Sequence, residues 1–237
     1  RARALLERCA ELAERFDDTL AQAMVFVLTM LVMRELGDAE ATLRFAERAI
    51  AVSTAYPFWM SNAQLGRGWS LVTLARTGEH VDEAVLEPMR QGLAFFDLIA
   101  QKLPLSYWMT HLVEACLGLE RVDEAHEVLE RARGLADVHL DVFYRPELER
   151  LAARVALARG DRALAEQLCD RSIALANQTG AHLLGLRSVI DKAELMRARG
   201  AGEAAIPLLD EACELASGAR STPFHAAALA LRMRCVP

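Results

Sequence analysis

The stretch Glu124-Ala125-His126-Glu127-Val128-Leu129-Glu130-Arg131-Ala132 has small or apolar side chains at Ala125, Leu129 and Ala132. A spacing of four and then three residues places these side chains on one face of an α-helix. The same pattern recurs along the chain and always ends on a small residue, here called the anchor: Cys9, Ala49, Gly92, Ala132, Ser172 and Ala212. Successive anchors lie 40, 43, 40, 40 and 40 residues apart. This regular period predicts a structure built from repeats.

A second apolar segment lies between successive anchor helices. The joints Gly37-Asp38, Gly78-Glu79, Gly160-Asp161 and Gly200-Ala201 place glycine just after a helix, and Thr222-Pro223 is typical of a helix start. The pattern predicts an all-α chain of twelve helices without strands. Their expected ranges are about 2–15, 18–36, 39–54, 56–76, 82–102, 104–120, 122–135, 141–159, 162–178, 181–199, 203–217 and 222–235.

Glycine joints followed by a helix with this small-residue spacing resemble the second helix of a tetratricopeptide repeat, although the period exceeds the usual 34 residues. The resemblance implies a superhelical solenoid of antiparallel helix pairs, forming a single array over residues 1–237. A small anchor allows two helices to cross closely. Armadillo and HEAT repeats have similar periods but lack this stripe, so they are the second interpretation.

Composition narrows the function classes. The chain is 53% hydrophobic and 25% charged, which argues against disorder, and its net charge of −6 gives no general attraction to nucleic acid or to anionic membranes. The most apolar stretch, 20–33, is too short to cross a bilayer. Five separated cysteines in helical runs favour the reducing cytoplasm. Because the chain starts Arg1-Ala2-Arg3, we expect it to be a fragment of a longer polypeptide.

The motifs of catalysis and metal binding are missing from the sequence. It has no glycine-rich phosphate loop ending in Lys-Ser or Lys-Thr, no HExxH pair and no cysteine pairs at zinc spacing. We therefore expect no catalytic, cofactor or metal site, and no enzyme activity, in this chain.

A narrower resemblance rests on five segments: 58–60 (Phe-Trp-Met), 65–71 (Leu-Gly-Arg-Gly-Trp-Ser-Leu), 90–94 (Arg-Gln-Gly-Leu-Ala), 112–115 (Leu-Val-Glu-Ala) and 143–148 (Phe-Tyr-Arg-Pro-Glu-Leu). Together they resemble the C-terminal repeat region of large bacterial regulatory ATPases. The resemblance implies a signalling or transcriptional regulator with an adenylate/guanylate cyclase or DNA-binding domain and a nucleotide-binding switch elsewhere. This array would be its sensor or partner-binding arm.

Counting back from the anchors predicts which first-helix residues line a groove. The candidates for partner binding are Met24, Val27, Leu31, Arg34, Arg67, Tyr107, Glu114, Arg150, Arg154, Arg187 and Arg197. One end of this groove is apolar and the other is rich in arginine. The arginines could clamp a carboxylate or phosphate. Alternatively, they could form internal ion pairs with Glu147 and Glu194, which lie at helical spacing.

Two hypotheses follow for function. The first is a protein-interaction or regulatory scaffold whose groove binds a peptide, the upstream domains of its own polypeptide, or a second copy through an apolar patch at Met24, Val27 and Leu31. The second is a sensor whose curvature responds to a small ligand in the groove. A role as part of a cyclase or ATPase ranks third, since it would depend on domains outside this sequence.

Overall fold

The computed structural model describes residues 2–16, 18–75, 81–100, 105–138, 142–220 and 222–236. These residues contain twelve α-helices and no strand, as the sequence predicts. The chain divides into two compact units, residues 1–121 and 122–237. This division does not test the expectation of a single array, which stays a prediction.

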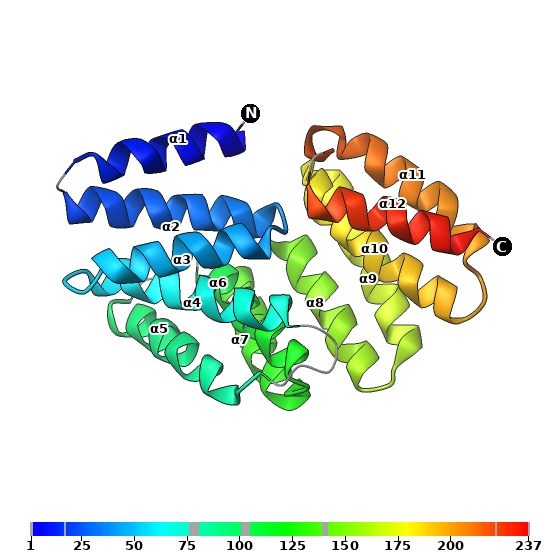
Figure 1. The fold of residues 1–237 in the computed structure, drawn as a ribbon. Helices are drawn as coiled ribbons and strands as arrows, with labels where there is room; N and C mark the ends of the chain where they lie inside the picture. Colours follow the sequence, from blue (N-terminus) through cyan, green and yellow to red (C-terminus); the bar gives the residue numbers. More distant parts are fainter. Residues whose placement is uncertain are drawn as a thin grey trace. The chain divides into compact units, whose positions relative to one another are not determined.

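Six of the α-helices lie in the first unit. They are α1 (Ala2–Glu14), α2 (Thr19–Glu35), α3 (Ala39–Val52), α4 (Pro57–Leu74), α5 (Leu86–Leu98) and α6 (Leu105–Gly118) (Figure 1). A short 3₁₀ helix, Glu83–Val85, precedes α5. The helix α4 packs against both α2 and α6, and the odd-numbered helices pack on the even-numbered ones beside them.

The second unit repeats this arrangement. Its helices are α7 (Val122–Val138), α8 (Arg145–Ala158), α9 (Arg162–Thr179), α10 (His182–Ala198), α11 (Ile206–Leu215) and α12 (Pro223–Cys235), with 3₁₀ turns at Glu203–Ala205 and Ser217–Ala219. Here α10 packs against both α8 and α12, while α9 packs against α8 and α10. Within each unit the even-numbered helices therefore contact each other in series.

The joints between helices have the predicted chemistry. Gly37 and Gly160 have φ of 80° and 85°, a left-handed conformation that suits glycine at a helix end. The following residues, Asp38 and Asp161, cap α3 and α9 by accepting hydrogen bonds from backbone N–H groups in the first turn. The predicted joint at Gly78 lies outside the described residues.

Five of the six anchors are buried, as expected for close helix crossings: Ala49, Gly92, Ala132, Ser172 and Ala212. Gly92 shows the reason most clearly, because a Cβ at this position would lie 3.0 Å from the backbone oxygen of Ser61 on α4. The small anchor is thus required by the neighbouring backbone at this crossing.

The anchor Cys9 is the exception, since it is exposed. With the 40-residue period, Leu5 on α1 corresponds to Phe45 on α3. Phe45 is 2% exposed whereas Leu5 is 61% exposed. The helix α1 packs on α2 and buries Ala10 and Ala13 instead. The expectation of a buried anchor is therefore wrong for α1, where Cys9 faces solvent and Leu6 is only partly buried.

Candidate functional site

The residues predicted to line a groove differ widely in exposure. Five are buried: Val27, Arg34, Tyr107, Arg150 and Arg187. Leu31, Arg67, Glu114 and Arg154 are partly buried, and Met24 and Arg197 are exposed. The assumption that all these positions face solvent is wrong for the buried five, because the even-numbered helices pack against one another and cover part of that face.

The expected apolar patch on α2 is likewise only partly present. Val27 is fully buried, as are the neighbouring Met30 and Met33, whereas Met24 is 40% exposed. A carboxylate introduced at Val27 would therefore lie in the core, so a Val27→Asp variant would report on folding and not on a surface.

In the first unit, Arg34 lies at the centre of a buried polar cluster. Its guanidinium group donates to Glu114 Oε2 at 2.9 Å and to Thr110 Oγ1 at 3.0 Å, both on α6. Trp69 Nε1 on α4 donates to the same glutamate oxygen at 2.8 Å. Arg34 also lies over the rings of Trp69 and Tyr107, 5.6 and 5.4 Å from their centroids. These contacts join α2, α4 and α6 and account for the burial of a cationic side chain.

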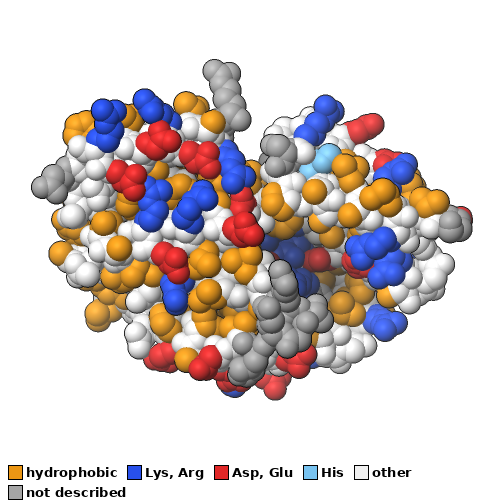
Figure 2. Space-filling view, viewed as in Figure 1, with side chains coloured by type: hydrophobic (Ala, Val, Ile, Leu, Met, Phe, Trp, Pro, Cys, Tyr) orange, Lys and Arg blue, Asp and Glu red, His pale blue; other side chains and the backbone are white. Residues whose placement is uncertain are grey.

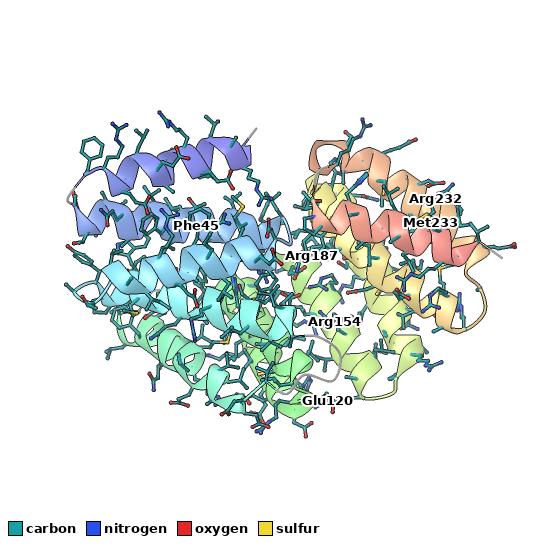
Figure 3. The ribbon with its side chains drawn as sticks, viewed as in Figure 1. Phe45, Glu120, Arg154, Arg187, Arg232 and Met233 are labelled. Atoms are coloured by element: carbon teal, nitrogen blue, oxygen red, sulfur yellow. The ribbon has the colours of Figure 1, made fainter. Side chains whose placement is uncertain are left out.

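In the second unit, Glu147 plays the corresponding central role. This carboxylate is fully buried and accepts two hydrogen bonds from Arg150, at 2.7 and 2.9 Å. Arg187, labelled in Figure 3, reaches the same carboxylate from α10 at 2.8 Å. Arg150 also pairs with Asp191 at 2.9 Å. The ion-pair interpretation of Arg150 and Arg187 is confirmed.

Arg197 also fits the ion-pair interpretation, but at the surface. Its Nε lies 3.0 Å from Glu194 Oε2, and Arg234 on α12 reaches the other oxygen of that carboxylate at 2.8 Å. Such exposed pairs contribute little to stability. They do, however, compensate the negative charge of Glu194 on this part of the surface.

A pocket of about 630 Å³ lies in the second unit, where the C-terminal halves of α8 and α10 flank the N-terminal half of α9. Its buried floor consists of Ala153, Cys169 and Leu195. The more exposed lining residues are Arg154, Leu157, Arg162, Ala163, Glu166, Asp191, Glu194, Arg197, Ala198 and Arg199. The space-filling view shows basic side chains among apolar ones on this unit (Figure 2). Only Arg154 and Arg197 were among the sequence candidates.

The pocket forms because the side chains below it are small. The core cluster at this junction consists of Ala153, Ala156, Ala165, Cys169 and Leu195. By contrast, the next junction, formed by α10, α11 and α12, is filled by larger side chains that include Met196, Leu209 and Leu231. Where alanines of neighbouring helices face each other, their side chains are too small to fill the space between the helices, and a cavity remains. The alanines of 152–158 and 163–165 are the sequence signal that could have indicated this pocket.

The floor of the pocket is uncharged at neutral pH. Burial raises the pKa of the Cys169 thiol to about 12, and the negative charge of Asp191 adds to this effect. The thiolate is the form that reacts with electrophiles. At neutral pH Cys169 is therefore a protonated thiol, which is a poor nucleophile and adds to the apolar surface of the floor.

This pKa predicts a specific pH dependence for labelling. The rate at which iodoacetamide alkylates Cys169 should rise about tenfold per pH unit from pH 8 to pH 10 without levelling off, because the thiolate fraction grows throughout this range. Mass spectrometry of the Cys169 peptide measures the rate, and exposed Cys9 serves to show that the reagent is active. A plateau below pH 10 in a chain that keeps its helical signal would contradict the assigned pKa.

The described residues contain no cluster of three or more histidine, cysteine or acidic side chains that could hold a metal ion. His80 and His139 lie outside the described residues. Nor does any helix in the described part combine the length and hydropathy needed to cross a membrane.

Comparisons with known proteins provide no assignment for the site. No family model matches the chain, and no curated protein sequence matches it. The structural features that bear on function are therefore the pocket and the two buried polar clusters around Arg34 and Glu147.

Proposed function

We propose that this chain is a tetratricopeptide-like binding scaffold that acts as the partner-binding arm of a bacterial signalling or transcriptional regulator. The anchor period near 40 residues supports the repeat assignment, together with the serial packing of even-numbered helices in each unit. The regulatory context rests on the sequence resemblance to bacterial regulatory ATPases. The scaffold itself performs no chemistry in this proposal and is located in the cytoplasm.

The pocket in the second unit is the observation that carries the binding role. Its floor is apolar, and its rim presents charged side chains from three different helices. Concave sites with apolar walls and a few polar groups are typical of binding sites. A partner segment that inserts one apolar side chain here would bury it against Ala153 and Leu195. Rim groups such as Arg197 would lie beside its backbone and flanking charges.

A second candidate function is a sensor for a small ligand, and the pocket volume favours it. About 630 Å³ lies within the usual range for drug-sized ligands. A ligand bound to α8, α9 and α10 together would hold these helices in one arrangement. In the sensor hypothesis, ligand binding shifts the chain toward one helix arrangement and so changes the surfaces available to a partner.

Selection of short random peptides displayed on phage tests the scaffold proposal. The chain is immobilised, and enriched peptides are measured against two tryptophan variants. Ala163 lines the pocket at its exposed edge, so Ala163→Trp should obstruct the pocket without disturbing the core. Ala174 is exposed on the same helix and does not line the pocket, so Ala174→Trp is the matched control.

We expect the enriched peptides to bind the native chain and Ala174→Trp equally, and to lose about tenfold or more in affinity for Ala163→Trp. Circular dichroism should show the same helix content for all three proteins. Failure to enrich any peptide would contradict the scaffold proposal. So would peptides that bind Ala163→Trp as tightly as the native chain.

A further inference from the structure

We propose that the pocket between α8, α9 and α10 binds a small amphipathic anion, a molecule with an aliphatic body and a carboxylate or similar acidic head. This inference rests on the second candidate function, the ligand sensor, and specifies the chemical class of its ligand. Three properties of the pocket support it: the balance of charge around the rim, the position of Arg162, and the composition of the floor and walls.

The rim has an excess of positive charge. Four arginines and three carboxylates line the pocket. Every one of these carboxylates already pairs with an arginine: Glu166 with Arg199 at 2.7 Å, Glu194 with Arg197 at 3.0 Å, and Asp191 with Arg150 at 2.9 Å. Two of the pairing arginines, Arg150 and Arg234, are not themselves lining residues. An anionic ligand would therefore meet carboxylates whose charge is already compensated by arginines. A cationic ligand would instead have to compete with these arginines for the same carboxylates.

Arg162 offers a cationic group to the head of such a ligand. It is exposed, begins α9 and makes no side-chain ion pair or hydrogen bond with the residues that the structure describes. The neighbouring carboxylate of Asp161 is engaged as the cap of α9, where it accepts a hydrogen bond from Leu164 N at 3.0 Å. A guanidinium group can form two parallel hydrogen bonds with a carboxylate or phosphate.

The interior of the pocket suits an aliphatic body. The floor is formed by the side chains of Ala153, Cys169 and Leu195, and the apolar parts of the walls by alanine and leucine. No aromatic ring is present among the lining residues described here. Sugars and nucleobases commonly bind through stacking on aromatic rings, so they fit this surface poorly. A flexible alkyl chain or a compact aliphatic ring can bury its surface here without stacking.

Titration calorimetry with decanoate, kept below its micelle concentration, tests this inference. Two further probes separate the contributions: decyltrimethylammonium has the same chain with a cationic head, and acetate has the acidic head without the chain. We expect one decanoate per chain, with an affinity about tenfold or more above that of either comparison probe. Ala163→Trp should abolish this difference, whereas Ala174→Trp should preserve it.

Two arginine variants test the position of the head group. Arg162→Gln should weaken decanoate binding roughly three- to tenfold, because a charge-assisted hydrogen bond is lost. Arg171→Gln is the matched control: Arg171 is on the same helix, is exposed and does not line the pocket. Decanoate binding should be unchanged in this variant.

Each outcome bears on the inference separately from the scaffold proposal. Equal binding of decyltrimethylammonium would overturn the anionic class, and unchanged decanoate binding in Ala163→Trp would overturn the location. If decanoate fails to bind while phage-selected peptides bind through the pocket, the ligand class is wrong and the scaffold stands. If both fail, neither proposal survives.

Discussion

Glu147→Gln is expected to lower the free energy of unfolding by about 3–5 kcal/mol. The carboxylate is fully buried, accepts hydrogen bonds from Arg150 and forms an ion pair with Arg187. These two arginines are themselves only 4% and 3% exposed as side chains. Glutamine has nearly the same shape but no charge. The substitution therefore leaves two buried guanidinium groups near one another with less negative charge to offset them. Unfolding in urea, followed by circular dichroism, measures the loss.

The control for this prediction is a carboxylate that is itself exposed to solvent. Glu130 pairs with Arg133 at 3.1 Å on the surface of α7, so Glu130→Gln should cost no more than about 1 kcal/mol. Glu147→Asp keeps the charge but shortens the side chain, and it should fall between the two. If Glu147→Gln and Glu130→Gln were equally stable, the buried cluster would not have the importance that its geometry indicates.

The sequence predicted the helices because the signals for helix ends are local. Glycine after a helix and aspartate before the next one, as at Gly160 and Asp161, fix a boundary through a few backbone hydrogen bonds. The expected helix at 82–102 shows the limit of this reasoning. Residues 83–85 form a 3₁₀ turn, and the α-helix runs over 86–98. Composition and spacing do not distinguish a tight first turn from an α-helical one.

The division into two units was not visible in the sequence. The boundary lies between residues 121 and 122, yet the anchor interval that spans it, from Gly92 to Ala132, is 40 residues, the common value. The longer interval of 43 residues lies between Ala49 and Gly92, inside the first unit. Repeat spacing reports on helix pairs, whereas the division depends on how many contacts adjacent helices make.

The groove residues could be predicted only in part, because burial on an even-numbered helix depends on its neighbours. Arg34 and Arg187 have the charge expected of surface residues, but each is enclosed by partners on other helices. Nothing in a single helical pattern shows that Glu114, 80 residues away, will meet Arg34. The pocket was missed for a related reason: it results from side chains such as Ala153 being too small to fill a junction.

Gly92→Leu is expected to destabilise the first unit by about 2–3 kcal/mol. A Cβ at this position would lie 3.0 Å from the Ser61 backbone oxygen and 3.5 Å from the Ser61 Cα. Backbone atoms inside α4 cannot move aside independently, so the whole helix would have to shift and open the packing between α4 and α5. This strain outweighs the gain of replacing glycine inside a helix, which is at most about 1 kcal/mol. The shift of the urea midpoint measures the net effect.

Gly134 provides the matched comparison for this crossing. It also lies inside a helix, α7, but a Cβ there would meet no atom within 4 Å. Gly134→Leu gains helix propensity without strain, so it should leave stability unchanged or raise it by up to about 1 kcal/mol. The two substitutions should therefore have opposite signs, although both place the same side chain at a helical glycine. If Gly92→Leu and Gly134→Leu lowered the urea midpoint equally, the loss of stability would come from placing leucine in a helix and not from the contact with Ser61. The small anchor at Gly92 would then not be required by the crossing.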